Sequence, residues 1–125
     1  YQKRLEKRFA VTWAFPSAGT KESEATLILK QIKDDDTVLL LDERGKDIDT
    51  PGVARMLDTA MQSGTKRLVV VIGGAFGVHT SVVERANLTY KLSSLVFPHM
   101  LVRLILIEQL YRANSILEGG KYHHA

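Results

Sequence analysis

The segment from Leu92 to Ala125 reads LSSLVFPHMLVRLILIEQLYRANSILEGGKYHHA. Its pattern predicts a short apolar strand, a Pro98-His99 junction, a long helix over Met100–Leu117 and a polar tail. A helix this rich in Leu, Ile and Val is expected to be buried on nearly every face, which favours a role for part of it as a subunit interface. The polar residues on or beside it are His99, Arg103, Glu108, Gln109, Arg112 and Asn114. Polar side chains on such a helix, next to a His-containing tail, indicate a functional site.

The same helix approaches the length of a membrane span, since a bilayer needs about 20 apolar residues. However, Arg103, Glu108 and Arg112 fall inside it. Each charge near the bilayer centre costs about 2.5–3.5 kcal/mol. The sequence therefore predicts a buried helix of a soluble domain and no membrane partner.

The composition is typical of a single globular domain. The chain has 125 residues, of which 45% are hydrophobic and 25% are charged, and we expect residues 1–125 to form one domain. Cysteine is absent, which excludes disulfides, thiolate metal sites and a cysteine nucleophile. This composition agrees with a cytoplasmic location.

The positive charge is concentrated near the first residues of the chain. The net charge is +3 and the sequence pI is about 9.3. Tyr1, Leu5 and Phe9 recur at helical spacing and predict an amphipathic helix. Two interpretations are open for its polar face, namely a solvated surface or a patch that contacts nucleic-acid phosphates. The basic residues of this face are Lys3, Arg4, Lys7 and Arg8.

Apolar periodicity predicts alternating strands and helices along the rest of the chain. The run Thr37–Leu41 is typical of a strand covered on both faces, as in a parallel sheet. Thr50 and Pro51 predict a helix start with Thr50 as the N-cap. The alternation indicates an α/β fold with a mostly parallel sheet flanked by helices. Further strands are expected over Ala10–Phe15, Arg67–Ile72 and Leu92–Phe97, and further helices over Glu22–Lys33, Pro51–Met61 and Val82–Ala86.

Three predicted strand ends carry residues suited to a ligand, because ligands of α/β sheets bind beyond the carboxyl ends of the strands. The glycines among them allow close approach to the main chain. Their spacing matches neither the dinucleotide-binding fingerprint nor the phosphate-binding P-loop. They predict either a ligand loop of another kind or a tight turn. The three ends are Leu41-Asp42-Glu43-Arg44-Gly45, Gly73-Gly74-Ala75-Phe76-Gly77 and Phe97-Pro98-His99.

The polar side chains near these ends each allow more than one interpretation. His99 could be a general base, a hydrogen-bonding anchor or a capping residue for the following helix. Asp42 could bind a ribose hydroxyl or lie solvated in a loop. Arg112 could contact a substrate or pair with Glu108, one helical turn earlier.

The other histidines indicate no metal site. His79 is expected at the surface, at the start of a helix. His123-His124 lie near the end of the chain without nearby carboxylates, which makes them poor metal ligands. Gly119-Gly120 precede them and could allow the tail to fold back over a site.

Together, these segments resemble the RlmH family of SPOUT methyltransferases. Their order and spacing match over about Thr37–His124, and the block that begins at Glu108 is the most specific. In that family a strand precedes the first helix, so we expect a strand before residue 1. The matching segments are Leu40-Leu41-Asp42 with Gly45, Val71-Ile72-Gly73-Gly74 with Gly77, Leu92-Ser93 with Pro98-His99, Leu101-Val102-Arg103, Glu108-Gln109-Leu110-Tyr111-Arg112-Ala113 and Tyr122-His123.

The resemblance implies a trefoil-knotted α/β fold with its knot at the C-terminal end, an exception to the general rule against knots. It also implies a homodimer, S-adenosylmethionine as cofactor, and methylation of N3 of a pseudouridine in bacterial large-subunit (23S) ribosomal RNA within the ribosome. Two other functions stay open, a non-catalytic RNA-binding SPOUT domain and another nucleotide-binding α/β module. By position, the implied cofactor contacts are Leu41, Gly74, Ser93, Ser94, Leu95, Val96, Phe97 and Pro98, and the implied catalytic residues on the RNA side are His99, Arg112, Tyr122 and His123.

Overall fold

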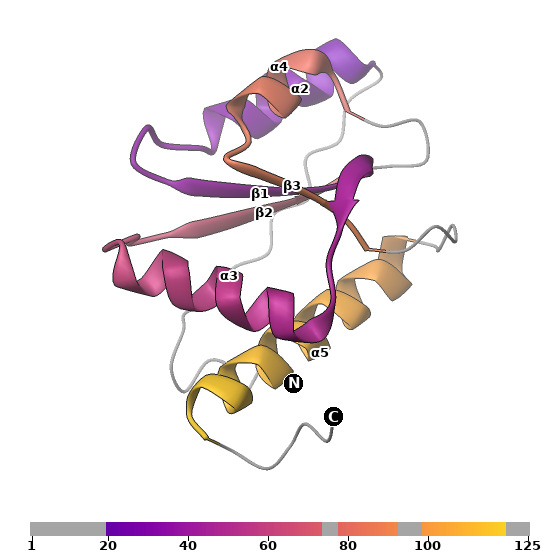
Figure 1. Ribbon diagram of the computed structural model, residues 1–125. Coiled ribbons are helices and arrows are strands. Elements are labelled where there is room, and N and C mark those ends of the chain that lie inside the picture. Colours follow the sequence, from indigo (N-terminus) through magenta and orange to yellow (C-terminus); the bar gives the residue numbers. More distant parts are fainter. Residues whose placement is uncertain (1–19, 74–77, 93–98, 120–125) are drawn as a thin grey trace. The chain divides into compact units, whose positions relative to one another are not determined.

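The computed structural model describes residues 20–73, 78–92 and 99–119 (Figure 1). These residues belong to two compact units. One unit contains the described residues 20–47, 64–73 and 78–92, and it holds the sheet. The other contains residues 48–63 and 99–119, and it holds two helices.

The sheet has three described strands, β1 (Thr37–Asp47), β2 (Leu68–Ile72) and β3 (Leu88–Lys91), in the order β2-β1-β3. Both neighbours run parallel to β1. The first half of β1 is the buried centre of the sheet, because Val38 and Leu40 are completely buried and Leu39 and Leu41 nearly so. Since alternate side chains of a strand point to opposite faces, both faces of β1 are buried. The predicted parallel sheet is therefore confirmed.

Helices α2 (Lys21–Lys30) and α4 (Thr80–Arg85) lie on the same side of this sheet (Figure 1). Their inward residues Ala25 and Val82 join a core with Val38, Leu40 and Val71. Full burial of a Val or Leu side chain contributes about 1.5–3 kcal/mol to stability. This core holds β1 and β2 in the register that pairs Leu41 with Ile72, which places their carboxyl ends side by side.

The second unit consists of α3 (Thr50–Gln62) and α5 (His99–Leu117), which pack against each other (Figure 1). The hydroxyl of Thr50 donates to Oε1 of Gln109 across 2.7 Å and fixes the start of α3 on the middle of α5. Leu106, Ile107 and Ala113 of α5 are buried.

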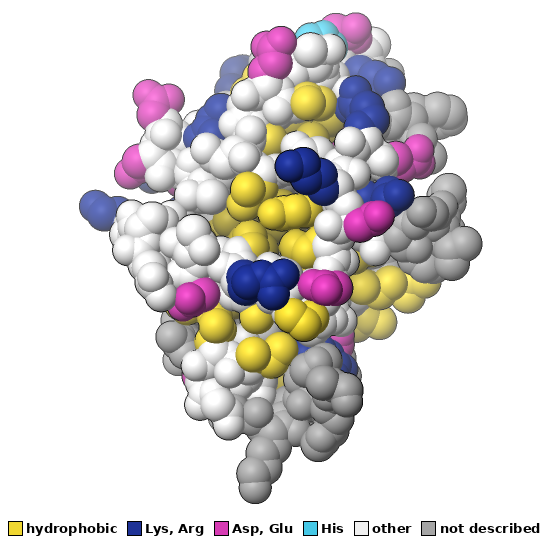
Figure 2. Space-filling view, in the orientation of Figure 1, with side chains coloured by type: hydrophobic (Ala, Val, Ile, Leu, Met, Phe, Trp, Pro, Cys, Tyr) yellow, Lys and Arg dark blue, Asp and Glu magenta, His cyan; other side chains and the backbone are white. Residues whose placement is uncertain are grey.

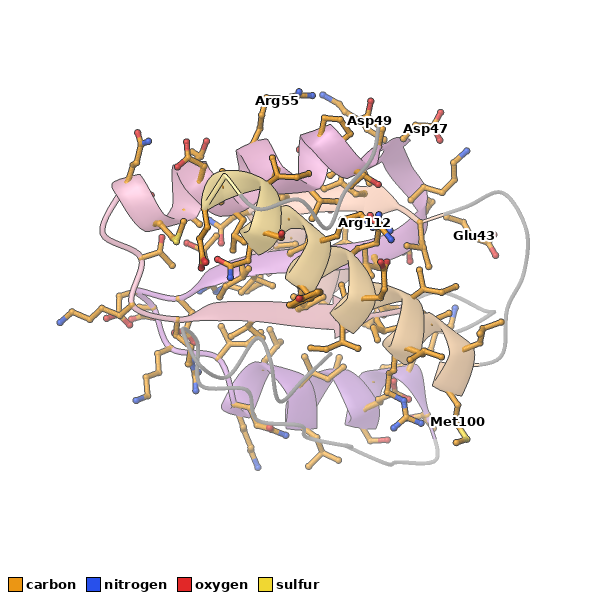
Figure 3. All side chains as sticks on the ribbon, turned by 90° about the horizontal axis from the view of Figure 1, so that it is seen from below. Glu43, Asp47, Asp49, Arg55, Met100 and Arg112 are labelled. Carbon is orange, nitrogen blue, oxygen red and sulfur yellow. The ribbon has the colours of Figure 1, made fainter. Side chains whose placement is uncertain are left out.

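The first turns of α5 carry large apolar side chains that are exposed within one chain. Met100 is 75% exposed, Leu104 54% and Leu101 40%, and Figure 3 shows Met100 projecting away from the helix. The predicted burial of this end would need a second subunit and stays a prediction. No helix among the described residues is both long and apolar enough to cross a membrane.

Several predicted boundaries are also corrected. Helix α2 ends at Lys30, not Lys33, because Asp36 turns the chain by accepting a hydrogen bond from the Lys33 backbone N–H. The N-cap of α3 is Asp49, whose carboxylate accepts from the N–H of Gly52 across 2.8 Å. Thr50 is the first helical residue instead, since its hydroxyl is used on Gln109.

A strand over Leu88–Lys91 follows α4, ahead of the strand predicted over Leu92–Phe97. The predicted strand lies almost entirely outside the described residues and stays a prediction. The pairing of Leu39 with Leu88 sets this position. Residues 93–98, and the predicted elements over Tyr1–Phe9 and Ala10–Phe15, lie outside the described part of the chain.

Candidate functional site

The carboxyl ends of β1 and β2 meet at a glycine. The backbone N–H of Gly73 donates to the carbonyl oxygen of Leu41 across 2.8 Å. A Cβ atom at Gly73 would lie 3.0 Å from that oxygen and 3.2 Å from Oδ2 of Asp42. Both approaches are tighter than ordinary side-chain packing allows. Glycine is thus the residue that lets the two strand ends lie this close together.

Asp42 is the next residue along β1, and its side chain is only 3% exposed. Its carboxylate accepts from the backbone N–H of Arg44 at 2.9 Å, from Nε at 2.8 Å and from Nη2 at 3.2 Å. These hydrogen bonds lower the pKa of the Asp42 carboxyl below its ordinary value, against the opposing effect of burial. Asp42 is therefore an ionised, buried carboxylate at neutral pH, which excludes the interpretation as a solvated loop residue. Its other interpretation, as a ribose ligand, stays a prediction.

Arg44 connects this carboxylate to Val78, the first described residue after Gly73. Its Nη2 also donates to the carbonyl oxygen of Val78, at 3.4 Å, while its side chain is 58% exposed. Val78 itself is buried. The sequence analysis missed this pair, although the close spacing of Asp42 and Arg44 after an apolar strand was a usable signal.

Residues 42–45 form an irregularity in β1. Leu41 and Lys46 both pair with Tyr90 of β3, so the four residues between them bulge out of the ladder. A Cβ atom at Gly45 would lie 2.5 Å from the backbone carbon of Tyr90. This contact excludes any side chain at position 45. Strand β1 consequently continues to Asp47, whereas the prediction ended it at Leu41.

Helix α5 presents a second set of connected polar side chains. Arg112 donates its Nε–H to Oε1 of Glu108 across 2.8 Å, which confirms the predicted pairing. Oε2 of Glu108 accepts from Nε2 of Gln109 at 2.9 Å, and Gln109 in turn accepts from Thr50 of α3. The side chains of Arg112 and Glu108 are 26% and 17% exposed. The guanidinium is thus held in one orientation at a partly exposed position (Figure 3).

Asn114 lies two residues beyond Arg112 and is buried. Its amide nitrogen donates to Oε1 of Glu118 at 2.9 Å. Its amide oxygen has no hydrogen-bond donor among the residues that the structure describes.

The structure also shows the positions of His79 and His99 in the chain. His79 is the N-cap of α4, where its Nδ1 accepts from the backbone N–H of Ser81 at 3.1 Å, and it is half-buried. The predicted helix start is thus confirmed. His99 is the first residue of α5.

The remaining predicted contacts lie outside the described residues, and their roles stay predictions. They are Gly74, the segment Ser93, Ser94, Leu95, Val96, Phe97 and Pro98, and the tail residues Tyr122 and His123. Within residues 20–73, 78–92 and 99–119, no three His, Asp or Glu side chains lie close enough to hold a metal ion.

Comparison with known proteins shows to which family the chain belongs. The chain matches the family described as "Predicted SPOUT methyltransferase" over residues 1–123. It is 44% identical over 104 residues to "Ribosomal RNA large subunit methyltransferase H" of Bacteroides thetaiotaomicron, covering 83% of this chain and 66% of that protein. A protein of the same name from Geotalea daltonii is 43% identical over 104 residues, which cover 83% and 68% of the two chains.

A plant protein is also similar to this chain. A protein of Arabidopsis thaliana that is named as a candidate RNA methyltransferase is 48% identical to this chain over 103 residues. The match covers 82% of this chain and 53% of that protein. The chain thus spans about half to two thirds of the length of these relatives. From the family match and these relatives, the chain belongs to the SPOUT methyltransferase family, and the predicted resemblance to its RlmH members is confirmed.

Proposed function

We propose that this chain methylates N3 of a pseudouridine in bacterial large-subunit (23S) ribosomal RNA, with S-adenosylmethionine as the methyl donor. The observation that carries the proposal is the 2.8 Å hydrogen bond from Gly73 to Leu41. It brings together two of the strand ends at which the RlmH resemblance assigns cofactor contacts. The names of the bacterial relatives support ribosomal RNA as the substrate.

The described residues at these strand ends fit such a cofactor. Leu41 has a buried apolar side chain, and Gly73 carries no side chain at a place where a Cβ would crowd Leu41 and Asp42. This strand end also lies where ligands of open α/β sheets bind, which supports the assignment. When bound, S-adenosylmethionine supplies an electrophilic methyl group on a sulfonium. By position, Gly74 and residues 93–98 complete its contacts.

On the RNA side, the protein must accept one proton from the base and stabilise the negative charge that remains on it. The imide N3–H must lose its proton before the nitrogen forms a bond to the methyl carbon, and the sulfur keeps the electrons of the bond that breaks. Arg112, held by Glu108, is suited to stabilise the deprotonated imide. His99 and His123 are the candidate bases, and Tyr122 is a candidate positioning residue. Orientation of the two reactants contributes up to about 7–11 kcal/mol.

A homodimer is part of the proposal. Met100, Leu101 and Leu104 are exposed on the first turns of α5, although each is a large apolar side chain. Covering them in a second copy stabilises the pair by about 1.5–3 kcal/mol for each side chain fully buried. The reaction needs no metal ion, and a cytoplasmic location follows from a ribosomal substrate.

Titration calorimetry of the chain with S-adenosylmethionine tests the cofactor. Saturable binding with one site per chain is expected, and S-adenosylhomocysteine should compete for the same site. A folded chain that binds neither compound would contradict the enzyme and favour a non-catalytic RNA-binding SPOUT domain. Membership of the SPOUT family leaves the alternative of an unrelated nucleotide-binding module without support.

A further inference from the structure

Two buried aspartates at opposite ends of the buried half of β1 each bind an arginine. Asp36 precedes the strand and binds Arg67, while Asp42 follows Leu41 and binds Arg44. Both carboxylates are 3% exposed, and the arginine side chains are 46% and 58% exposed. Asp42 lies six positions after Asp36, or about 20 Å along an extended strand. The pairs are alike in chemistry and differ in what they connect.

The Asp36 pair connects distant parts of the fold. Arg67 donates from Nε to Asp36 at 2.9 Å and from Nη2 to the carbonyl oxygen of Gln31 at 2.6 Å. It therefore ties the start of β2 to the end of α2, at the amino end of the sheet. This arrangement explains the pair as an anchor of the fold.

The Asp42 pair makes no such connection through its carboxylate, because Arg44 is only two residues away. Local ion pairs with an exposed cation contribute little to stability, whereas burying a carboxylate is unfavourable. Fold stability alone does not explain why Asp42 is buried. What the pair does achieve is to fix the Arg44 guanidinium through both Nε and Nη2.

The fixed guanidinium reaches Val78, the residue that follows the glycine segment (residues 73–77). Arg44 donates to the carbonyl oxygen of Val78, while Gly73, at the other end, donates to Leu41. Both ends of the segment 73–78 are thus attached to β1, through the main chain of Leu41 and the side chain of Arg44. The bond to Val78 is long, at 3.4 Å, so it depends on how firmly Asp42 orients the guanidinium.

We infer that Asp42 and Arg44 are positioning residues that set the distance between Gly73 and Val78 and thereby shape the edge of the sheet to which the methyl donor is assigned. Asp42 orients Arg44, and Arg44 holds Val78 opposite Gly73. The inference rests on the proposed function, since it assigns this edge of the sheet to S-adenosylmethionine. Neither residue is required to touch the cofactor.

The test compares Arg44→Gln with the matched control Arg67→Gln by calorimetric titration with S-adenosylmethionine and by thermal unfolding. Arg44→Gln should weaken binding at least tenfold and lower Tm less than the control does. Arg67→Gln should lower Tm and keep the dissociation constant within twofold of wild type. Asp42→Asn should resemble Arg44→Gln, and Arg44→Lys should restore only part of the affinity, because an ammonium cannot hold Asp42 and Val78 together.

The outcomes separate the inference from the proposed function. If the wild-type chain binds and Arg44→Gln binds within twofold of it, the positioning role is wrong and the cofactor assignment stands. If Arg44→Gln keeps cofactor affinity but binds ribosomes more weakly, Arg44 is an RNA contact instead, which also overturns the inference. Absence of binding by the folded wild-type chain would overturn both.

Discussion

Arg112 donates its Nε–H to Oε1 of Glu108, one turn earlier on α5, across 2.8 Å. Glu108 is in turn linked through Gln109 to Thr50 on α3. The pair is therefore more than an exposed contact within one helix, because a hydrogen-bonded chain from a second helix fixes the carboxylate. Such support keeps a functional side chain in one geometry.

Replacing Glu108 with Gln should lower kcat about tenfold and leave KM for S-adenosylmethionine unchanged. The amide still packs in place but no longer orients the guanidinium by charge. In the proposed reaction Arg112 acts on the RNA base rather than on the cofactor, so kcat and not KM should change. Steady-state kinetics on ribosomes measure both constants. The matched control is Asp58→Asn, which changes a half-buried carboxylate that accepts from Gln62 on α3 at 3.0 Å. Equal kinetics for the two variants would remove Arg112 from the reaction.

Replacing Gly45 with Ala should destabilise the fold by about 3 kcal/mol or more, the upper end of overpacking costs, since the new methyl would overlap the backbone of Tyr90. Gly64→Ala is the control, because it has a φ of 77° and nothing within 4 Å of the added Cβ. It should cost only about 1–2 kcal/mol of backbone strain. Urea unfolding gives both values, and a Gly45→Ala variant no less stable than Gly64→Ala would show that the bulge in β1 is mispositioned.

The stability contributed by Asp36 should depend on pH in one direction. Hydrogen bonds from Arg67 lower the pKa of Asp36 below its usual 3.8, against the effect of burial. A carboxyl with a lower pKa in the folded state stabilises the fold above its unfolded pKa, and this stability is lost as the pH falls through the folded value. The free energy of unfolding of wild type minus that of Asp36→Asn should therefore be largest at neutral pH and shrink below about pH 4. A difference that grows on acidification would contradict this sign.

Leu104→Glu should convert a dimer into a monomer. Leu104 is 54% exposed on α5, and a carboxylate there could not be buried between two copies without a large desolvation cost. Sedimentation should show the mass falling from about twice 14.0 kDa to 14.0 kDa. Gln62→Glu, which adds the same charge to an exposed position of α3, should leave the mass unchanged. A monomeric wild-type chain would refute the proposed dimer directly.

Charges of both signs are mixed on the part of the surface that Figure 2 describes. On this face, Lys and Arg side chains lie beside Asp and Glu side chains. The net charge of the whole chain is +3. For the proposed ribosomal RNA substrate, we expect contacts of individual side chains to contribute alongside charge attraction.

Local patterns predicted the parts of the structure that local interactions determine. The apolar run Thr37–Leu41 identified the buried half of β1, and the spacing of Glu108 and Arg112 identified their ion pair. The second half of β1 was missed because its charged residues look like a loop. Only the pairing of Lys46 with Tyr90, 44 positions further along the chain, makes it a strand.

Long-range contacts likewise decided the details of the candidate site. Asp49 and Thr50 are both good N-caps by type, and a hydrogen bond to Gln109, 59 residues away, assigns Thr50 to another role. The cofactor edge was predicted from Leu41 and the glycines. The burial of Asp42 was not, because a carboxylate after a strand is usually solvated and the position of Val78 is invisible in the sequence.

The measurement that tests the central claim most directly is nucleoside mass spectrometry of 23S ribosomal RNA from bacterial ribosomes lacking this methylation, after incubation with the chain and S-adenosylmethionine. The account predicts conversion of a pseudouridine to its N3-methyl derivative, and a loss of that product in Arg112→Ala by about 10²-fold or more. Methylation of another nucleoside, or no product from a chain that binds the cofactor, would contradict it.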